Sequence, residues 1–139
     1  MLIAGLLSIL SLKTLLLIFS GVVLGIVFGA IPGITVTMGV ALFLPITFGM
    51  TPIEGLSLLM GLYIGGTSGG LISAILLKIP GTPASIATTF DGHPMAVRGE
   101  AGRALGIGIV YSFLGGMFSL IVLMLPAPAL AEFAIQFGL

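Results

Sequence analysis

The segment TPIEGLSLLMGLYIGGTSGGLISAILLK, residues 51–78, combines a helix start signal with a long uncharged run. Thr51 suits the N-cap, Pro52 the first helical position and Glu54 the third, so that Thr51 and Glu54 form a capping box. The remainder is free of charge up to its last residue. Because about 20 apolar residues carry a helix across a hydrocarbon core of roughly 30 Å, the segment predicts a membrane-spanning helix over 52–77.

A glycine cluster interrupts the middle of this segment, at residues 65–70. It reads Gly-Gly-Thr-Ser-Gly-Gly, with four glycines in six residues. Each glycine in a helix interior costs roughly 1 kcal/mol relative to alanine. We therefore expect a break or an unwound turn at 65–70.

The rest of the chain also has the composition of a membrane protein. Of its 139 residues 58% are hydrophobic and only 6% are charged, and the mean hydropathy is +1.38. A soluble domain carries about 25% charged residues because its surface faces water. Uncharged stretches predict further crossings over about 14–31 and 105–125. The predicted fold is all-α, with polytopic transmembrane helices and with Pro-Gly-interrupted and re-entrant segments.

The apolar segment 34–49 is short for a full crossing. Pro32-Gly33 separates it from the first predicted span. A re-entrant arm and a complete crossing both fit its length, and the sequence leaves that choice open. A further helix is expected to begin at Pro128, because proline suits the first helical position.

The distribution of basic residues predicts the orientation in the membrane. Three of the four, Lys78, Arg98 and Arg103, lie close together. Basic residues concentrate in cytoplasmic loops, so the loop 84–103 is predicted to be cytoplasmic. Lys13 favours a cytoplasmic N-terminus as well, which requires an even number of crossings before that loop. Within the loop, Asp91-Gly-His-Pro94 is typical of a turn.

Several classes of chemistry have little support in the composition. The net charge is zero, and no basic stripe indicates nucleic acid. The chain has no cysteine, which excludes disulfides and thiolate chemistry. One histidine and four scattered acids leave little material for a metal site. We expect no cofactor, and no metal beyond a transported Na⁺.

Glycines also recur at every fourth residue in two parts of the chain. This spacing places bare backbone along one helix face, so that a neighbouring helix can approach closely. Tight packing is the simplest interpretation, and a sliding surface in a transporter is compatible with it. The two rows are Gly21, Gly25, Gly29 and Gly33, and then Gly61, Gly65 and Gly69.

The triplet Ile-Pro-Gly occurs twice, at 31–33 and 79–81, and hydroxyl residues follow each copy. Interrupting a helix in lipid leaves backbone groups unpaired, at several kcal/mol each, unless protein or a wet cavity surrounds them. Freed carbonyls can hold Na⁺, and a half-helix N-terminus can hold a carboxylate. Two such interruptions together with the glycine cluster favour a binding site over plain kinks. The hydroxyl residues are Thr35, Thr37, Thr82 and Ser85.

A serine hydrolase is a weaker alternative. Gly66-Thr-Ser-Gly-Gly70 fits the G-x-S-x-G nucleophile pattern. Ser68 would need a base within hydrogen-bond reach, and His93 is the one histidine in the sequence. No other residue is a candidate for catalysis.

Seven ungapped strings carry a resemblance to a known family. They occur in one order and spacing: Gly25-Ile-Val-Phe-Gly-Ala-Ile-Pro-Gly33, Leu44-Pro-Ile-Thr-Phe-Gly-Met50, Tyr63-Ile-Gly-Gly66, Ile72-Ser-Ala-Ile-Leu-Leu77, Pro80-Gly-Thr-Pro-Ala-Ser85, Asp91-Gly-His-Pro-Met-Ala96 and Gly102-Arg-Ala-Leu-Gly106. Together they closely resemble the large permease subunit of the tripartite tricarboxylate transporters (TctA-like), over roughly residues 12–135.

The resemblance implies a multi-pass secondary transporter of the bacterial inner membrane, importing citrate or related carboxylates with Na⁺ or H⁺. It implies a small membrane subunit and a periplasmic substrate-binding protein as partners. Carried onto this chain, the family's Pro-Gly segments and the glycine cluster give one substrate and ion region. Its residues are Pro32, Gly33, Thr35, Thr67, Ser68, Pro80, Gly81, Thr82 and Ser85.

Two departures from the family pattern bear on that expectation. Family members often have Ser at the position of Leu71 and Asn at that of Lys78, and a Lys facing the site would alter its preference. Family permeases are also several times longer, so residues 1–139 resemble the N-terminal portion. Half of a two-repeat site is not expected to transport without the C-terminal remainder. A small structural or assembly subunit without transport activity is the alternative.

Overall fold

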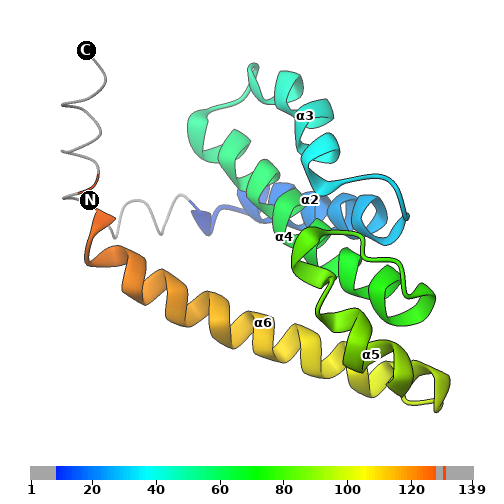
Figure 1. Cartoon of the computed structure of the whole chain (residues 1–139). Coiled ribbons are helices and arrows are strands. Elements are labelled where there is room, and N and C mark those ends of the chain that lie inside the picture. Colours follow the sequence, from blue (N-terminus) through cyan, green and yellow to red (C-terminus); the bar gives the residue numbers. More distant parts are fainter. Residues whose placement is uncertain (1–8, 128–129, 131–139) are drawn as a thin grey trace. The chain divides into compact units, whose positions relative to one another are not determined.

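The computed structural model describes residues 9–127 and residue 130. Every regular element in these ranges is helical, which confirms the all-α prediction (Figure 1). Three of the helices, α2, α4 and α6, are long and apolar enough to cross a membrane, which confirms a polytopic chain. The elements are α2 (Leu12–Ala30), α3 (Val36–Thr47), α4 (Pro52–Leu77), the 3₁₀ turn η1 (Pro83–Ser85), α5 (Thr88–Val97) and α6 (Ala101–Met124).

The predicted start signal at 51–54 lies where α4 begins, and two further helices have caps that were not predicted. Ser11 caps α2 by accepting a hydrogen bond from the backbone N–H of Thr14 at 3.3 Å. Thr35 caps α3 in the same way, accepting from the N–H of Met38 at 3.2 Å. Pro52 is the first residue of α4, and Glu54 accepts from the N–H of Thr51 at 3.4 Å. Caps of this kind satisfy N–H groups that a helix leaves without intrahelical partners.

The predicted break at 65–70 is wrong, because α4 is one continuous helix over its 26 residues. Gly65, Gly66, Gly69 and Gly70 are all buried inside the packed unit. Close packing of other segments against these glycines stabilises the helix by more than their low helix propensity destabilises it. Propensity is a weak prior that such tertiary contacts override.

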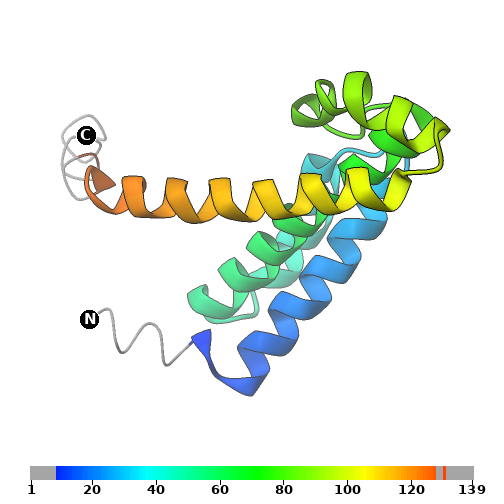
Figure 2. The same ribbon diagram turned by 90° about the horizontal axis from the view of Figure 1, so that it is seen from below.

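Helices α2 and α4 lie side by side and run in the same direction (Figures 1 and 2). A side chain at Gly21 would meet the carbonyl oxygen of Leu58, and one at Gly29 would meet that of Gly66. The glycines of α4 likewise face the backbone of α2: an ideal β-carbon on Gly61 would lie 2.6 Å from the carbonyl oxygen of Ile18. The two glycine rows therefore bring the backbones into direct contact, as predicted from their spacing.

Gly33 does not belong to the first row. It has a φ of +94° and no atom lies within 4 Å of an ideal β-carbon there. Glycine is required at this position because other residues rarely adopt that backbone conformation. The row ends at Gly29, and Gly33 forms the turn after Pro32.

Helix α3 runs back along α4 in the opposite direction. Val36, at its start, packs on Gly66, and Thr47, at its end, packs on Gly55. The segment 34–49 therefore returns the chain along α4 instead of doubling back on itself. Its 12 helical residues span only about 18 Å, and non-helical turns at both ends complete the return.

The tetrapeptide Asp91-Gly-His-Pro94 lies inside helix α5 and is not the predicted turn. Gly92 lets α5 approach α4, since the side chain of Ile75 would lie 2.8 Å from a β-carbon there. The chain turns later, at Gly99, which has a φ of +84°. Residues up to Leu105 form one unit and those from Gly106 a second. The helix predicted to begin at Pro128 lies outside the described residues.

Candidate functional site

The start of α3, the middle of α4 and the segment 81–84 line one pocket of about 360 Å³. The start of α3 contributes residues that follow the first turn, and the loop before η1 contributes residues that follow the second. Helix α4 forms the wall between them. The lining residues are Thr35, Val36, Thr37, Tyr63, Thr67, Gly81, Thr82, Pro83 and Ala84.

The second turn is held by backbone contacts that only glycine allows. A β-carbon on Gly81 would lie 2.6 Å from the carbonyl oxygen of Gly29, 2.8 Å from Oγ of Ser73 and 2.9 Å from the α-carbon of Gly70. Thr82 follows directly and packs over Gly70, whose β-carbon would lie 3.0 Å from its methyl group. The second turn therefore packs directly on the backbone of Gly29 in α2 and Gly70 in α4.

The start of α3 supplies hydrogen-bond donors. The N–H groups of Val36 and Thr37 precede the first helical hydrogen bonds, so they have no acceptor within the helix. The hydroxyl of Thr35 accepts from Met38, which leaves its proton available to another acceptor. N-terminal N–H groups of this kind, reinforced by the helix dipole, favour an anion.

Thr67 and Thr82 differ in what their hydroxyls can still do. Thr67 donates to the carbonyl of Ile64 at 2.9 Å, so it can accept further bonds or bind a cation. Oγ1 of Thr82 is buried and has no hydrogen-bond partner among the described residues. The Ser85 N–H faces the Thr82 side chain in a capping-box arrangement, but it donates to the Thr82 carbonyl oxygen at 3.0 Å, as does Ser85 Oγ at 2.8 Å, so no hydrogen bond reaches Thr82 Oγ1. A buried unpaired hydroxyl costs about 1–3 kcal/mol, which a ligand in the pocket would offset.

Four of the nine predicted site residues line the pocket: Thr35, Thr67, Gly81 and Thr82. The remaining five, Pro32, Gly33, Ser68, Pro80 and Ser85, are not part of its lining. Ser85 has a structural role, since its Oγ also accepts from the Thr82 N–H at 3.1 Å. Tyr63 was missed, although it lies one helical turn before Thr67 and shares its face.

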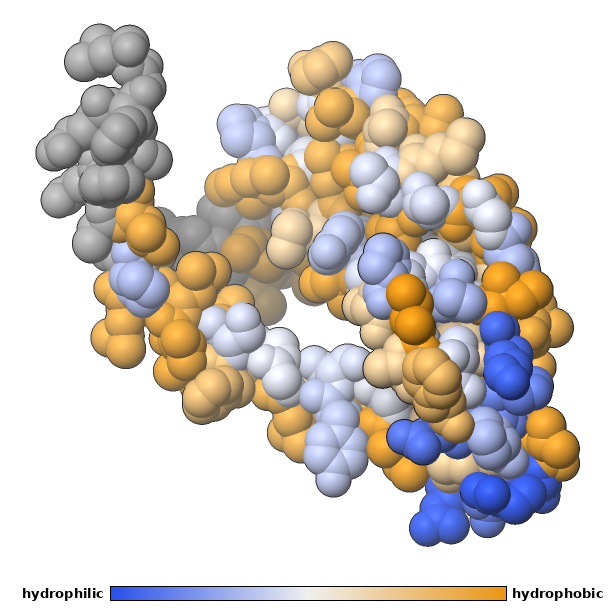
Figure 3. All heavy atoms as spheres, viewed as in Figure 1, coloured by the Kyte–Doolittle hydropathy of each residue, from blue (hydrophilic) through white to orange (hydrophobic). Residues whose placement is uncertain are grey.

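No charged side chain lines this pocket. Within the described ranges there is also no group of three or more His, Asp or Glu residues that could hold a metal ion. Lys78, which could have attracted an anion, ends α4 outside the lining. A ligand here would meet neutral hydroxyls and backbone dipoles only. Figure 3 shows that the strongly hydrophilic residues gather instead around α5 and the turn after it.

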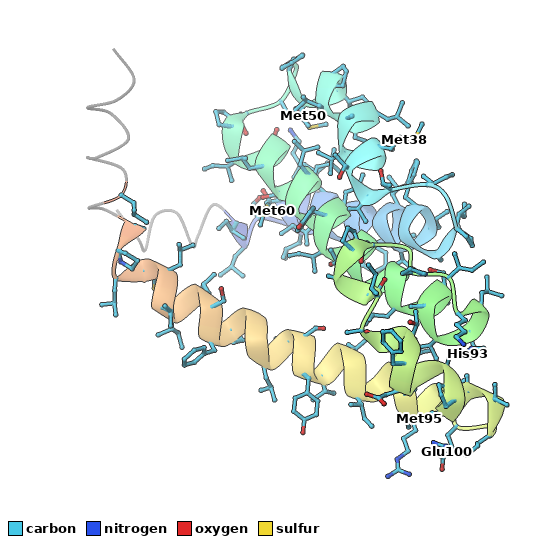
Figure 4. The ribbon with its side chains drawn as sticks, viewed as in Figure 1. Met38, Met50, Met60, His93, Met95 and Glu100 are labelled. Carbon is cyan, nitrogen blue, oxygen red and sulfur yellow. The ribbon has the colours of Figure 1, made fainter. Side chains whose placement is uncertain are left out.

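The pair required by the hydrolase alternative is not formed. Nδ1 of His93 lies 3.0 Å from the carbonyl oxygen of Ile75, at the junction of α5 and α4 (Figure 4). Because a carbonyl only accepts, Nδ1 carries the proton in this contact. The carbonyl of Ile75 is one of the last four of α4 and lacks an intrahelical partner. His93 therefore caps α4, and no hydrogen bond joins it to Ser68 in the described part of the chain.

Glu54 is also accounted for structurally. Its carboxylate pairs with Nζ of Lys13 at 2.8 Å, in addition to its contact with the N–H of Thr51. The Glu54 side chain is 16% exposed, whereas that of Lys13 is 73% exposed. This ion pair joins the starts of α4 and α2. From the sequence Glu54 was interpreted as a capping residue, with an ion-coupling carboxylate as the alternative, and its pairing with Lys13 was not predicted.

Apolar helices of spanning length, joined through two Pro-Gly turns beside a hydroxyl-lined pocket, define a polytopic membrane protein with a candidate site near those turns. The sequence comparison identifies its family. Residues 15–139 match the tripartite tricarboxylate transporter TctA family, and the chain belongs to it. This is a family of transporters.

One relative comes from Agrobacterium vitis and is described as "Uncharacterized 52.8 kDa protein in TAR-I ttuC' 3'region". It is 42% identical to this chain over 120 residues, which are 86% of the chain and 24% of the relative. The chain thus spans about a quarter of the relative's length. No solved structure matches the chain.

Proposed function

We propose that the chain supplies part of the substrate and ion site of a secondary, binding-protein-dependent permease that imports citrate-like tricarboxylates or related carboxylates with Na⁺ or H⁺. One observation carries the proposal. Thr35, Thr67 and Thr82, which come from three separate segments, line a single pocket beside the two Pro-Gly turns. Membership of the TctA family supports a role in transport.

The donors of this pocket suit a carboxylate. N–H groups at the start of α3 and the free hydroxyl of Thr82 can each donate to a carboxylate oxygen. Hydrogen bonds to a charged group are worth about 1.5–3 kcal/mol each. Thr67, which has already donated its proton to Ile64, offers an oxygen to a co-transported cation instead. The neutral lining favours binding of anion and cation together over binding of either alone.

The proposal concerns the whole permease and not this chain alone. The chain spans about a quarter of its relative, and the second half of a repeat-built site would come from further residues. We further propose the bacterial inner membrane as its location, and as partners a small membrane subunit and a periplasmic substrate-binding protein. A structural or assembly subunit remains the competing function, and it predicts no ligand in the pocket.

Thiol labelling tests occupancy of the pocket directly, since the chain has no native cysteine. Thr37→Cys lines the pocket, whereas Met38→Cys is the next residue, is 55% exposed and does not line it. With Na⁺ present, citrate should slow maleimide labelling of Thr37→Cys several-fold and leave Met38→Cys unchanged. Equal labelling rates of Thr37→Cys with and without citrate and other di- or tricarboxylates would favour the assembly subunit.

A further inference from the structure

The packed unit has two distinct ends, connected by three helices. Helices α2 and α4 run in one direction between them, and α3 runs in the opposite direction. The start end contains the ion pair between Lys13 and Glu54, because α2 and α4 both begin there. The turn end contains both Pro-Gly turns, since Gly81 packs on Gly29. Helix α2, with 19 residues, spans roughly 28 Å. That length matches a hydrocarbon core of about 30 Å, so the two ends lie on opposite faces of the membrane.

The basic residues are divided unequally between these ends. Lys78 ends α4, and α5 packs on that end of α4 through His93 and Ile75. Arg98 and Arg103 flank the turn that follows α5, so all three basic residues lie at the turn end. The start end has Lys13 alone, and Glu54 neutralises it at 2.8 Å. Orientation follows the number of basic residues near each end of a span and depends little on acidic ones. Three against one favours the turn end as the cytoplasmic end.

We propose that the turn end faces the cytoplasm and that the start end, with Lys13 and Glu54, faces the opposite side of the membrane. Helices α2 and α4 then both cross inward, and α3 with its flanking turns crosses outward between them. The N-terminal end of α2 is therefore external, although Lys13 taken alone favours the cytoplasm. The single basic residue at the start end is outweighed by Lys78, Arg98 and Arg103 at the turn end.

This orientation has a consequence for the pocket. Thr35 and Thr82 follow the two turns, and Tyr63 and Thr67 lie at the middle of α4, so the pocket lies between the middle of the packed unit and its cytoplasmic end. Resting on the proposed function, this assigns the pocket to the side from which an imported carboxylate is released. Residues at the start end form the surface that a periplasmic partner can reach.

Two glycines give a matched pair of labelling sites. Gly49 lies between α3 and α4 at the start end, and Gly102 lies in the first turn of α6 at the turn end. At both positions no atom lies within 4 Å of an ideal β-carbon, so cysteine fits. Each variant is expressed in the full permease in intact cells and treated with a membrane-impermeant maleimide, before and after permeabilisation. Labelling after denaturation shows that each thiol is present.

Gly49→Cys should react in intact cells, and Gly102→Cys should react only after permeabilisation. The reverse pattern would overturn the proposed orientation, and equal labelling of both in intact cells would overturn the assignment of the ends to opposite faces. Phe48→Cys and Phe90→Cys, at positions 81% and 72% exposed, repeat the test if either glycine variant is poorly produced. The result does not depend on transport, so failure of the proposed function would leave this test intact.

Discussion

Gly81 lies against the carbonyl oxygen of Gly29, which would be only 2.6 Å from a β-carbon at position 81. The second Pro-Gly turn therefore rests on the end of the helix that precedes the first one. Segments about fifty residues apart in the sequence meet through bare backbone. This contact is what brings the hydroxyls of Thr35 and Thr82 to the same pocket.

Gly81→Ala should displace that turn. A carbonyl oxygen and the α-carbon of Gly70 cannot move aside as a flexible side chain would, so we expect a loss of about 1–3 kcal/mol in the free energy of unfolding. Citrate should also no longer protect Thr37→Cys from maleimide in the Gly81→Ala background. Full stability with full protection would show that the contact does not shape the pocket.

Gly25→Ala should separate α2 from α4. A β-carbon at this position would meet the carbonyl of Leu62, and overpacking of this kind costs about 1–3 kcal/mol. Gly102→Ala is the matched control, because it has open space and gains up to about 1 kcal/mol of helix propensity. Unfolding in a detergent series should therefore shift in opposite directions for the two variants. A shift of the same sign would mean that the glycine contact is not what holds the helices together.

His93→Ala should weaken the junction of α4 and α5. It leaves the carbonyl of the fully buried Ile75 without a donor, which costs about 1–3 kcal/mol. His93→Asn is the informative comparison, since its amide N–H₂ occupies a position similar to Nδ1. Thermal denaturation should show that Asn restores part of the stability lost in Ala. If both variants are equally unstable, the hydrogen bond to Ile75 does not contribute.

Lys78→Asn should stabilise the end of α4. Lys78 has a φ of 58°, in the left-handed region, which asparagine adopts at a lower energetic cost than lysine. We expect a gain of up to about 1 kcal/mol in the free energy of unfolding. Lys78→Gln, which has no such backbone preference, should change little, and equal effects of Asn and Gln would contradict this account.

Helix positions and helix contacts could be predicted from the sequence because they depend on local signals. The capping box at Thr51 and Glu54 acts within one helical turn, and so does the four-residue glycine spacing. The continuity of α4 could not be predicted in this way. It depends on segments far along the chain, such as Val36 and Gly81, packing onto Gly66 and Gly70.

Four of the nine residues proposed for the site line one pocket, and their role in binding stays a prediction. The Pro-Gly triplets marked the turns, and hydroxyls soon after each turn reached the pocket. Which hydroxyl faces the pocket depends on rotation about the backbone, so Ser85 became a local cap while Thr82 was left unpaired. The role of His93 depends on packing of α5 against α4, which brings it to Ile75, 18 residues earlier in the sequence. A short sequence motif does not predict such a contact.

Citrate uptake by the full permease carrying Thr82→Val is the most direct test of the central claim that this pocket binds the transported carboxylate. The hydroxyl has no partner in the described protein, so replacing it with a methyl group should not reduce folding stability. Loss of a hydrogen bond to a charged ligand should lower the initial rate of uptake about 10- to 100-fold at subsaturating citrate. Thr88→Val, outside the pocket, should leave the rate unchanged. Wild-type uptake by a normally produced Thr82→Val permease would contradict the account.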